Sequence, residues 1–225
     1  MGELAKEAAV STSVIKGLVE LGVLQSISLS PQGGSLNEPN PDTPGFELST
    51  AQQKAALSLC DAVKAADFGV YVIDGVPGSG KTEVYFEAIA EALRMGKQAL
   101  VLLPEIALGA QWRKRFTTRF GALPMEWHSD LTQARRRDTW RKITHGGPLV
   151  VVGARSALFL PYPDLGLIVA DEEHDAAYKQ EEGVIYNGRD MAVVRARSGS
   201  IPITLASATP SLETVINIKE GRYQS

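Results

Sequence analysis

The sequence of 225 residues holds one cysteine, Cys60. A single thiol excludes a disulfide within the chain and a cysteine-rich zinc site. No apolar run approaches the roughly 20 residues that span a bilayer. The first ten residues include Glu3, Lys6 and Glu7, a charge pattern unlike that of a secretory signal peptide. We therefore expect a globular cytoplasmic protein with no zinc and no membrane partner.

Neither sign of charge predominates in the whole sequence, since the net charge is only −3. The charges are nevertheless unevenly placed along it. Residues 111–145 carry nine Lys and Arg against three Asp and Glu, whereas residues 171–190 carry seven acidic against two basic residues. Basic patches are typical of nucleic-acid contact and acidic clusters of metal binding. Solvated helix faces are the ordinary alternative for either run.

The composition along the chain divides it into three segments. Residues 1–30 predict two short helices with a turn near Val10, the second capped by Ser11 or Thr12 and ended at Gly22, and then a possible strand at 26–30. This is interpreted as a partial helix-turn-helix (winged-helix) segment, better suited to packing than to DNA contact. Residues 31–45, with four prolines and three glycines, predict a linker or wing, and residues 46–225 the main domain.

Short apolar runs alternate with helical stretches throughout the main domain. The runs, mostly β-branched or leucine-rich, are residues 70–73, 99–103, 125–128, 149–152, 167–170 and 203–206. In the helical stretch 82–94, Tyr85, Ile89 and Leu93 fall on one stripe. This alternation predicts an α/β fold: a parallel sheet with helices on both faces. Trp112, Trp127 and Trp140 are interpreted as packing residues.

A glycine-rich stretch at residues 75–82 matches the pattern G-x-x-x-x-G-K-[ST], between an apolar strand and an amphipathic helix. Glycines let backbone N–H groups turn inward around a phosphate, and the helix N-terminus adds partial positive charge. Lys81 is expected to reach the β- and γ-phosphates and Thr82 to ligate Mg²⁺. The predicted nucleotide-binding residues are Gly75, Gly78, Ser79, Gly80, Lys81 and Thr82.

An acidic stretch, Asp171-Glu172-Glu173-His174, directly follows the apolar run 167–170. The carboxyl end of a parallel strand is where such sheets bind ligands. Asp171 is expected to hold Mg²⁺ through water, and Glu172 to polarise the water that attacks the γ-phosphate. The predicted catalytic residues are therefore Lys81, Asp171 and Glu172, and the predicted metal ligands Thr82 and Asp171.

Three stretches together, residues 75–82, residues 171–174 and Ser207-Ala208-Thr209-Pro210, resemble motifs I, II and III of superfamily 2 helicases. The intervening residues 103–108, 128–129, 155–159 and 178–183 are similar to those of the bacterial primosomal replication-restart helicases. The resemblance implies a RecA-like helicase lobe 1 for residues 46–225, with ATP and Mg²⁺ as cofactors.

The resemblance also implies roles for residues outside the phosphate loop. Gln52 would contact adenine, and His174 would couple the nucleotide site to Ser207 and Thr209. The residues implied to contact DNA are Glu105, Arg155, Ser156, Tyr178, Lys179 and Tyr186. The last three belong to an aromatic-rich loop that would sense single-stranded DNA by stacking.

The chain departs from the family pattern at two places. Val184 and Ile185 follow Gly183, where the family often has a tryptophan. Ala154 stands where a threonine is usual, which removes one possible hydrogen bond to a phosphate.

The resemblance implies an ATP-dependent 3′-to-5′ DNA helicase acting at stalled forks. Its partners would be single-stranded and forked DNA, replication-restart proteins and single-strand-binding protein. We interpret the chain as a fragment, because no counterpart of the family's second lobe, with its arginine finger and zinc element, is recognised. Weak ATP turnover is then expected from it alone. Two alternatives are a non-hydrolysing module that docks DNA or a partner, and another superfamily 2 helicase acting on RNA or branched DNA.

Overall fold

The computed structural model describes residues 8, 10–24, 38–104 and 110–225. The chain divides into two compact units, residues 1–35 and 36–225. The first contains α2 (Thr12–Glu20), which starts after Ser11, as predicted, although the Ser11 side chain makes no capping hydrogen bond. The predicted first helix and the possible strand at 26–30 fall largely or wholly outside the described residues, so the winged-helix segment stays a prediction.

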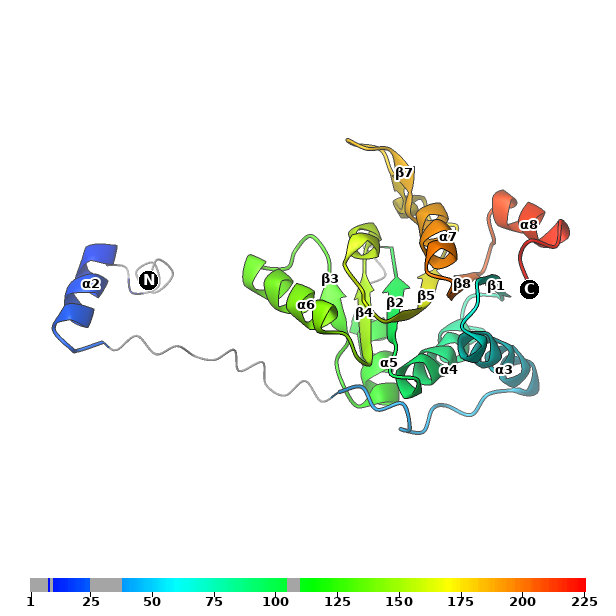
Figure 1. Ribbon diagram of the computed structural model, residues 1–225, viewed down its shortest axis with the longest axis horizontal. Helices are drawn as coiled ribbons and strands as arrows, with labels where there is room; N and C mark the ends of the chain where they lie inside the picture. Colours follow the sequence, from blue (N-terminus) through cyan, green and yellow to red (C-terminus); the bar gives the residue numbers. More distant parts are fainter. Residues whose placement is uncertain (1–7, 9, 25–37, 105–109) are drawn as a thin grey trace. The chain divides into compact units, whose positions relative to one another are not determined.

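The second unit is built on a parallel sheet of six strands, in the order β1-β8-β5-β2-β4-β3 (Figure 1). Every pairing between neighbouring strands of this sheet is parallel. Each of the six predicted apolar runs forms one of these strands, which confirms the α/β prediction. The strands are β1 (Gly69–Asp74), β2 (Gln98–Leu102), β3 (Met125–Trp127), β4 (Leu149–Gly153), β5 (Leu165–Asp171) and β8 (Pro202–Ser207).

Helices cover both faces of this sheet. One hydrophobic core joins a face of the sheet to α3 (Thr50–Ala65), α4 (Lys81–Arg94) and α5 (Ala110–Phe120). The other core joins the opposite face to α6 (Gln133–His145), the 3₁₀ helix η2 (Arg155–Phe159) and α7 (Gly188–Ser198). Figure 1 shows α3, α4 and α5 grouped below the sheet and α7 above it. The last helix, α8 (Leu212–Lys219), follows β8.

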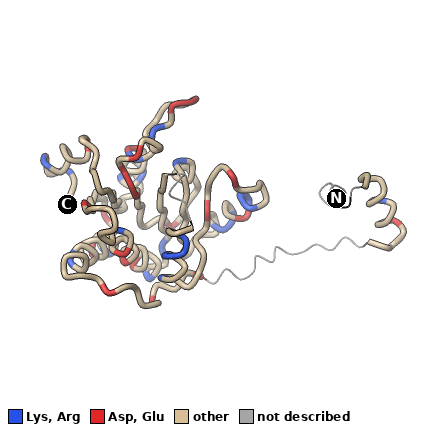
Figure 2. The backbone as a smooth tube through the Cα atoms, turned by 180° about the vertical axis from the view of Figure 1, so that it is seen from behind, with Lys and Arg blue, Asp and Glu red and all other residues tan. Residues whose placement is uncertain are grey.

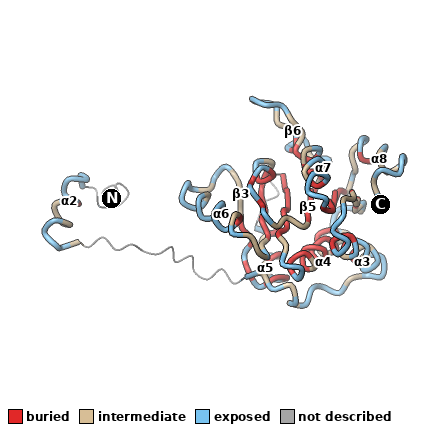
Figure 3. Tube along the Cα trace, viewed as in Figure 1, coloured by how far each residue is buried: buried red, intermediate tan, exposed pale blue. Residues whose placement is uncertain are grey.

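The central strand β2 is buried along its whole length, because helices cover it on both sides (Figure 3). Ala99 and Val101 belong to the first core, whereas Leu100 and Leu102 belong to the second. This is the two-residue alternation of a strand between two apolar layers. It explains why the sequence of β2 is continuously apolar after its first residue.

A hairpin projects from the sheet between β5 and α7. It consists of η3 (Ala176–Tyr178), β6 (Lys179–Gln180) and the antiparallel strand β7 (Tyr186–Asn187). Figure 2 shows acidic residues at its far end. Val184 and Ile185, in the connection between its strands, are 78% and 71% exposed.

The end of the predicted linker belongs to the second unit and packs against its helices. The buried Arg119 side chain donates hydrogen bonds to the carbonyl oxygens of Pro41 and Thr43 at 3.2 and 2.6 Å. Arg94 forms an ion pair with Asp42 at 3.0 Å. Residues 41–43 are therefore fastened to α4 and α5. Among the helices that the structure describes, none has the length and apolar character needed to cross a membrane.

Candidate active site

The predicted motifs meet at one edge of the sheet, because the carboxyl ends of parallel strands lie together. The loop 75–82 follows β1, residues 171–174 begin at the last residue of β5, and β8 lies between these two strands. The backbone N–H of Gly75 donates to the carbonyl oxygen of Ser207 at 3.2 Å, and that of Glu173 to Ala206 at 3.1 Å. The end of β8, where the third motif begins at Ser207, is therefore bonded to both of the other motifs.

The glycine-rich loop has the backbone geometry that a phosphate cradle needs. Gly78 and Gly80 have φ angles of +77° and +82°, a left-handed conformation that glycine adopts at little cost. Helix α4 begins at Lys81, directly after Gly80. The Lys81 ammonium donates to the Gly75 carbonyl oxygen at 2.8 Å and so lies over the loop. A phosphate oxygen is a stronger acceptor than a neutral carbonyl, so this ammonium can exchange one partner for the other.

Gln52 lies against the loop and uses both ends of its amide. It occupies the third position of α3, where its Oε1 accepts from the Ser49 backbone N–H at 2.8 Å in a capping box. Its Nε2 donates to the Ser79 carbonyl oxygen at 2.7 Å. Gln52 thus connects the start of α3 to the phosphate loop, whereas its contact with adenine stays a prediction.

Asp171 ends β5 as a buried carboxylate with one donor on each oxygen. Its Oδ1 accepts from the Glu172 backbone N–H at 3.0 Å, and its Oδ2 accepts from the Tyr85 hydroxyl at 2.8 Å. Burial raises the pKa of Asp171 above its usual value, while the Tyr85 hydrogen bond and Lys81 act in the opposite direction. Burial also raises the pKa of Tyr85 well above its usual value, so Tyr85 is a neutral phenol with a proton to donate.

The residues around Asp171 fit a magnesium ion that a nucleotide brings with it. In the described part of the chain, no group of three or more His, Cys, Asp or Glu side chains could hold a metal by itself. Asp171 is 8% exposed, and Lys81 is close enough to lower its pKa. Thr82, on the first turn of α4, is close enough to Tyr85 to lower the pKa of that phenol. One carboxylate and one hydroxyl are the small protein share that Mg²⁺ takes when phosphates and waters complete its shell.

Glu172, His174 and the third motif form one connected group. His174 Nδ1 lies 2.7 Å from Ser207 Oγ and 3.7 Å from Glu172 Oε2. Ser207 Oγ also accepts from the Thr209 backbone N–H at 3.0 Å. Glu172 has a φ angle of +50°, which is uncommon for a residue with a side chain. The residues expected to couple the motifs are therefore brought into contact, while the coupling itself stays a prediction.

Glu173 is the most buried residue of the acidic stretch, with its side chain 0% exposed. Its carboxylate accepts from Arg189 Nη1 at 3.1 Å, from the Ser211 backbone N–H at 2.7 Å and from Thr214 Oγ1 at 3.1 Å. It therefore fastens the end of β5 to α7 and to the start of α8. No sequence motif predicted a role for Glu173, because its partners lie too far along the chain for a local pattern to indicate one.

Tyr85 is a second residue at the site with no predicted functional role. The sequence pattern indicated only that it lies on the apolar stripe of a helix. It lies one helical turn after Lys81, so both side chains share a face of α4. That spacing is the signal that could have pointed to it. Trp112 is 7% exposed and packs in the first core, as expected. Trp140 is 47% exposed, so the packing interpretation is wrong for that residue.

Tyr178 is 2% exposed, which makes the expectation that it stacks on DNA bases wrong. Its hydroxyl lies 2.9 Å from the Leu102 carbonyl oxygen and 2.8 Å from that of Asp171. A ring enclosed in the second core and held by two backbone groups has no face open to a base. The aromatic residue was placed correctly next to motif II, but its environment is the core.

The remaining described residues that were expected to contact DNA lie in η2 and in the hairpin. Arg155 donates a hydrogen bond to the Lys179 carbonyl oxygen, and so joins η2 to the hairpin. Lys179 is an exposed side chain paired with Glu181 at 3.1 Å. Tyr186 packs edge-on against Phe159 with 5.4 Å between ring centroids. Ser156 is exposed, and Glu105 lies outside the described residues.

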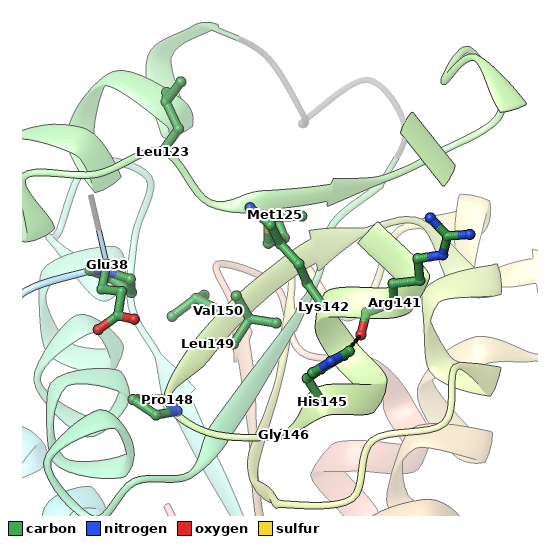
Figure 4. A pocket seen from close by; sticks show the side chains of 11 residues that line it. Glu38, Leu123, Met125, Arg141, Lys142, His145, Gly146, Pro148, Leu149 and Val150 are labelled. Carbon is green, nitrogen blue, oxygen red and sulfur yellow. Dashed lines mark hydrogen bonds between the residues drawn. The ribbon is translucent and has the colours of Figure 1, made fainter. Parts of the chain in front are cut away.

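A pocket of about 410 Å³ lies at the opposite edge of the sheet (Figure 4). It is lined by the amino-terminal ends of β3 and β4, at Met125 and Leu149, and by the end of α6. His145 in its wall has Nδ1 2.9 Å from the Arg141 carbonyl oxygen. Since the predicted motifs gather at the carboxyl edge, this pocket is separate from the candidate active site.

Comparison with known proteins places this fold and site in a class. A family profile described as DEAD/DEAH box helicase matches residues 50–218. The chain belongs to the DEAD/DEAH box helicase family. It is similar in fold to the structure of RecG bound to a three-way DNA junction, with a TM-score of 0.60 and 22% identity over 80% of this chain and 23% of that one.

Within that family, two similar curated relatives carry the same name. The chain is 49% identical over 178 residues to Replication restart protein PriA of Rickettsia conorii, covering 79% of this chain and 27% of the relative. It is 38% identical over 226 residues to Replication restart protein PriA of Bacillus subtilis, covering 99% of this chain and 28% of the relative. The resemblance to the replication-restart helicases is confirmed, and the chain spans little more than a quarter of these relatives.

Proposed function

We propose that this chain is the first, ATP-binding lobe of a DNA helicase that takes part in replication restart. The observation that carries the proposal is the meeting of three motifs at adjacent strand ends, where Lys81 lies over the phosphate loop and near the buried Asp171. The names of the relatives, Replication restart protein PriA, support a part in replication restart, and the proposed substrates are single-stranded and forked DNA.

Each group at the site has a distinct task in this proposal. The loop amides and Lys81 hold the phosphates, and Thr82 and Asp171 hold Mg²⁺, directly or through water. Bound Mg²⁺ neutralises charge on the phosphate oxygens. Glu172 accepts a hydrogen bond from the attacking water and orients it toward the γ-phosphate. With its side chain 40% exposed, Glu172 is open to that water, whereas Asp171 is enclosed.

The contacts around His174 support a path from nucleotide to DNA. His174 joins Glu172 to Ser207, and Arg155 joins η2 to the hairpin next to motif II. In the proposal, Arg155, Ser156, Lys179 and Tyr186 face single-stranded DNA, and the protein moves 3′ to 5′ along it. Other replication-restart proteins and single-strand-binding protein are its proposed partners.

The proposal assigns one catalytic group to a second lobe. In related phosphoryl-transfer enzymes an arginine finger contributes about 10³–10⁵ in rate. The described residues of the main unit contain one six-stranded parallel sheet, and the motifs at its edge are those of a first lobe. We therefore expect the chain alone to bind nucleotide and to hydrolyse ATP slowly.

Nucleotide binding by the 225-residue chain tests the proposal. We expect a fluorescent ADP analogue carrying a methylanthraniloyl group to bind in the presence of Mg²⁺. Lys81→Ala should weaken binding by at least about tenfold, because it removes a charge-assisted hydrogen bond to phosphate. Lys142→Ala, at the opposite edge of the sheet, is the matched control and should bind as wild type does. Equal binding by Lys81→Ala and wild type would contradict the proposal.

Hydrolysis separates the proposal from a docking module with an idle nucleotide site. Glu172→Gln should abolish the slow ATP turnover while ADP affinity stays within about twofold, because the side chain acts on water and not on the nucleotide. If Glu172→Gln leaves the turnover unchanged, the measured hydrolysis comes from a contaminating ATPase and the nucleotide site of this chain is idle. Competition between single-stranded DNA and RNA of the same sequence decides the nucleic-acid substrate.

A further inference from the structure

A chain of two hydrogen bonds connects α5 to the end of β5 through α4. The Trp112 indole Nε1–H donates to the Tyr85 hydroxyl oxygen at 2.7 Å, and the Tyr85 hydroxyl donates to Asp171 Oδ2 at 2.8 Å. The three side chains come from three elements that are far apart in the sequence. Trp112, Tyr85 and Asp171 are 7%, 0% and 8% exposed, so water competes little for these bonds.

The chemistry of the indole fixes the direction of this chain. An indole Nε1–H can only donate, so the Tyr85 oxygen must accept at that contact. The single proton of the phenol is then left for Asp171. Without Trp112, the Tyr85 hydroxyl proton could turn toward another acceptor. Trp112 therefore orients a proton on a neighbouring helix, and it does so without touching Asp171.

Packing and ion pairs hold Trp112 in register with α4. Its ring stacks on Phe116 with centroids 5.3 Å apart, and it meets the edge of Phe86 at 5.7 Å. Further along α5, Arg115 pairs with Glu83 and Arg119 with Glu87, two residues before and two residues after Tyr85 on α4. The contact between α4 and α5 is thus fixed on both sides of the Tyr85 hydroxyl.

The remaining lone pairs of Asp171 show what the hydrogen bonds are for. A carboxylate has about four acceptor positions. Tyr85 occupies one position on Oδ2 and the Glu172 N–H occupies one on Oδ1. Two donors, one on each oxygen, oppose rotation of the carboxylate and leave lone pairs of both oxygens for a cation or its bound water. Removal of the Tyr85 donor would free Asp171 to turn.

We propose that Tyr85, with its proton directed by Trp112, is a positioning residue that holds the Asp171 carboxylate in the orientation that binds the Mg²⁺ of the nucleotide. The inference rests on the proposed function, since it concerns the same nucleotide site. It adds Tyr85 and Trp112 to that site, and both should affect only the magnesium-dependent part of nucleotide binding. Neither residue is expected to touch the nucleotide.

The test compares nucleotide affinity with and without Mg²⁺ in the 225-residue chain. The quantity measured is the Mg²⁺ gain, the dissociation constant of the fluorescent ADP analogue in EDTA divided by that in saturating Mg²⁺. Tyr85→Phe should lower the gain about tenfold, as expected for the loss of a hydrogen bond to a charged group. Its affinity in EDTA should stay that of wild type. Trp112→Phe keeps a ring, removes the N–H and should lower the gain about threefold.

The double variant tests whether Trp112 acts through Tyr85. Trp112→Phe should have no further effect on the gain when it is added to Tyr85→Phe, because no phenol proton is left to direct. Tyr162→Phe is the matched control. Its hydroxyl is also buried and donates to a backbone oxygen, that of Ala157 at 3.0 Å, in the other core. It should leave the gain unchanged.

A spectroscopic readout separates positioning from a general loss of stability. The three tryptophans give three indole N–H signals in a ¹H–¹⁵N spectrum, and Trp112→Phe identifies the one from Trp112. Addition of Mg²⁺ to the ADP complex should shift the Trp112 signal in wild type and leave it unshifted in Tyr85→Phe. A purely structural hydrogen bond would not make that indole respond to Mg²⁺ through Tyr85.

The outcomes distinguish this inference from the proposed function. If wild type shows a Mg²⁺ gain, Lys81→Ala loses binding, and Tyr85→Phe keeps the wild-type gain, the positioning inference is overturned and the nucleotide site stands. If wild type shows no Mg²⁺-dependent binding at all, both are overturned. If Tyr85→Phe does not fold, Trp112→Phe decides by the same measurement.

Discussion

The start of the acidic segment 171–190 and the hairpin in its middle are both rich in acidic residues but have opposite environments. At the start, Asp171 and Glu173 are 8% and 2% exposed and every oxygen of their carboxylates accepts a hydrogen bond. In the hairpin that follows, the Glu181 side chain is 73% exposed and Val184 is 78% exposed. The difference comes from the elements around each region. Helices α4, α7 and α8 supply hydrogen-bond donors to the start of the segment, whereas few elements surround the hairpin.

This difference matches the two tasks that we propose for the segment. A group that binds a metal or orients water is most effective when its surroundings already hold it in place. A surface that follows a flexible single strand gains from side chains that are free to rearrange. Two-residue strands and exposed tips have little buried contact to oppose such movement.

The largest effect on the free energy of unfolding is expected at Glu173, the most buried carboxylate in this comparison. Glu173→Ala leaves the Arg189 guanidinium without its buried partner and removes the acceptor of Ser211 and Thr214. The free energy of unfolding should fall by about 3–5 kcal/mol in urea titrations. A fall of less than about 1 kcal/mol would show that the buried end is held no more firmly than an exposed pair.

The reactivity of Cys60 extends the comparison to burial elsewhere in the lobe. Burial, together with the nearby Glu91 and Glu87, raises the pKa of the Cys60 thiol from 9.0 to about 11. At pH 8 its thiolate fraction should be about 100-fold below that of an exposed thiol, so alkylation by iodoacetamide should be correspondingly slow. Urea should restore the rate of a free thiol, and equal rates in both states would contradict the burial.

The raised pKa of Cys60 also makes the free energy of unfolding depend on pH. The folded state holds the Cys60 proton more tightly than the unfolded chain does. This contribution to stability is therefore complete below a pH of about 9 and is lost as the pH rises toward about 11. Cys60→Ala should lack that part of the decline at alkaline pH.

The hairpin offers a gain rather than a loss. Val184→Trp places a large aromatic ring where the family often has one, and base stacking on a ring contributes about 1–3 kcal/mol. We expect single-stranded DNA to bind about tenfold more tightly, with an unchanged melting temperature, in a fluorescence anisotropy assay. Val194→Trp, at a position of α7 that is 53% exposed, is the control for added hydrophobic surface. Equal gains from both variants would contradict a specific role of the hairpin.

The smallest effect is expected at Glu181. Its pair with Lys179 at 3.1 Å joins two exposed side chains. Glu181→Ala should change the free energy of unfolding by less than about 0.5 kcal/mol in the same urea titration as Glu173→Ala. A larger loss would show that the hairpin contributes to the stability of the lobe.

Local patterns were sufficient to predict the sheet and the phosphate loop. Apolar runs mark strands covered on both faces, and glycines at fixed spacing before Lys81 mark a turn around phosphate. The hydrogen bonds of Tyr85 and Glu173 could not be predicted in this way, because Asp171 and Arg189 reach them only through the order of strands and the packing of helices. Tyr178 shows the same limit: the family resemblance implied a tyrosine open to DNA, and packing placed it in the core.

Glu172 has a backbone conformation that glycine or asparagine would adopt more readily, since its φ angle is +50°. Selection for folding alone would therefore not favour glutamate at this position. Replacement by glycine should make the lobe slightly harder to melt and, in our proposal, leave it unable to activate water. The most important side chain for hydrolysis would then be one that the fold tolerates at a small loss of thermal resistance.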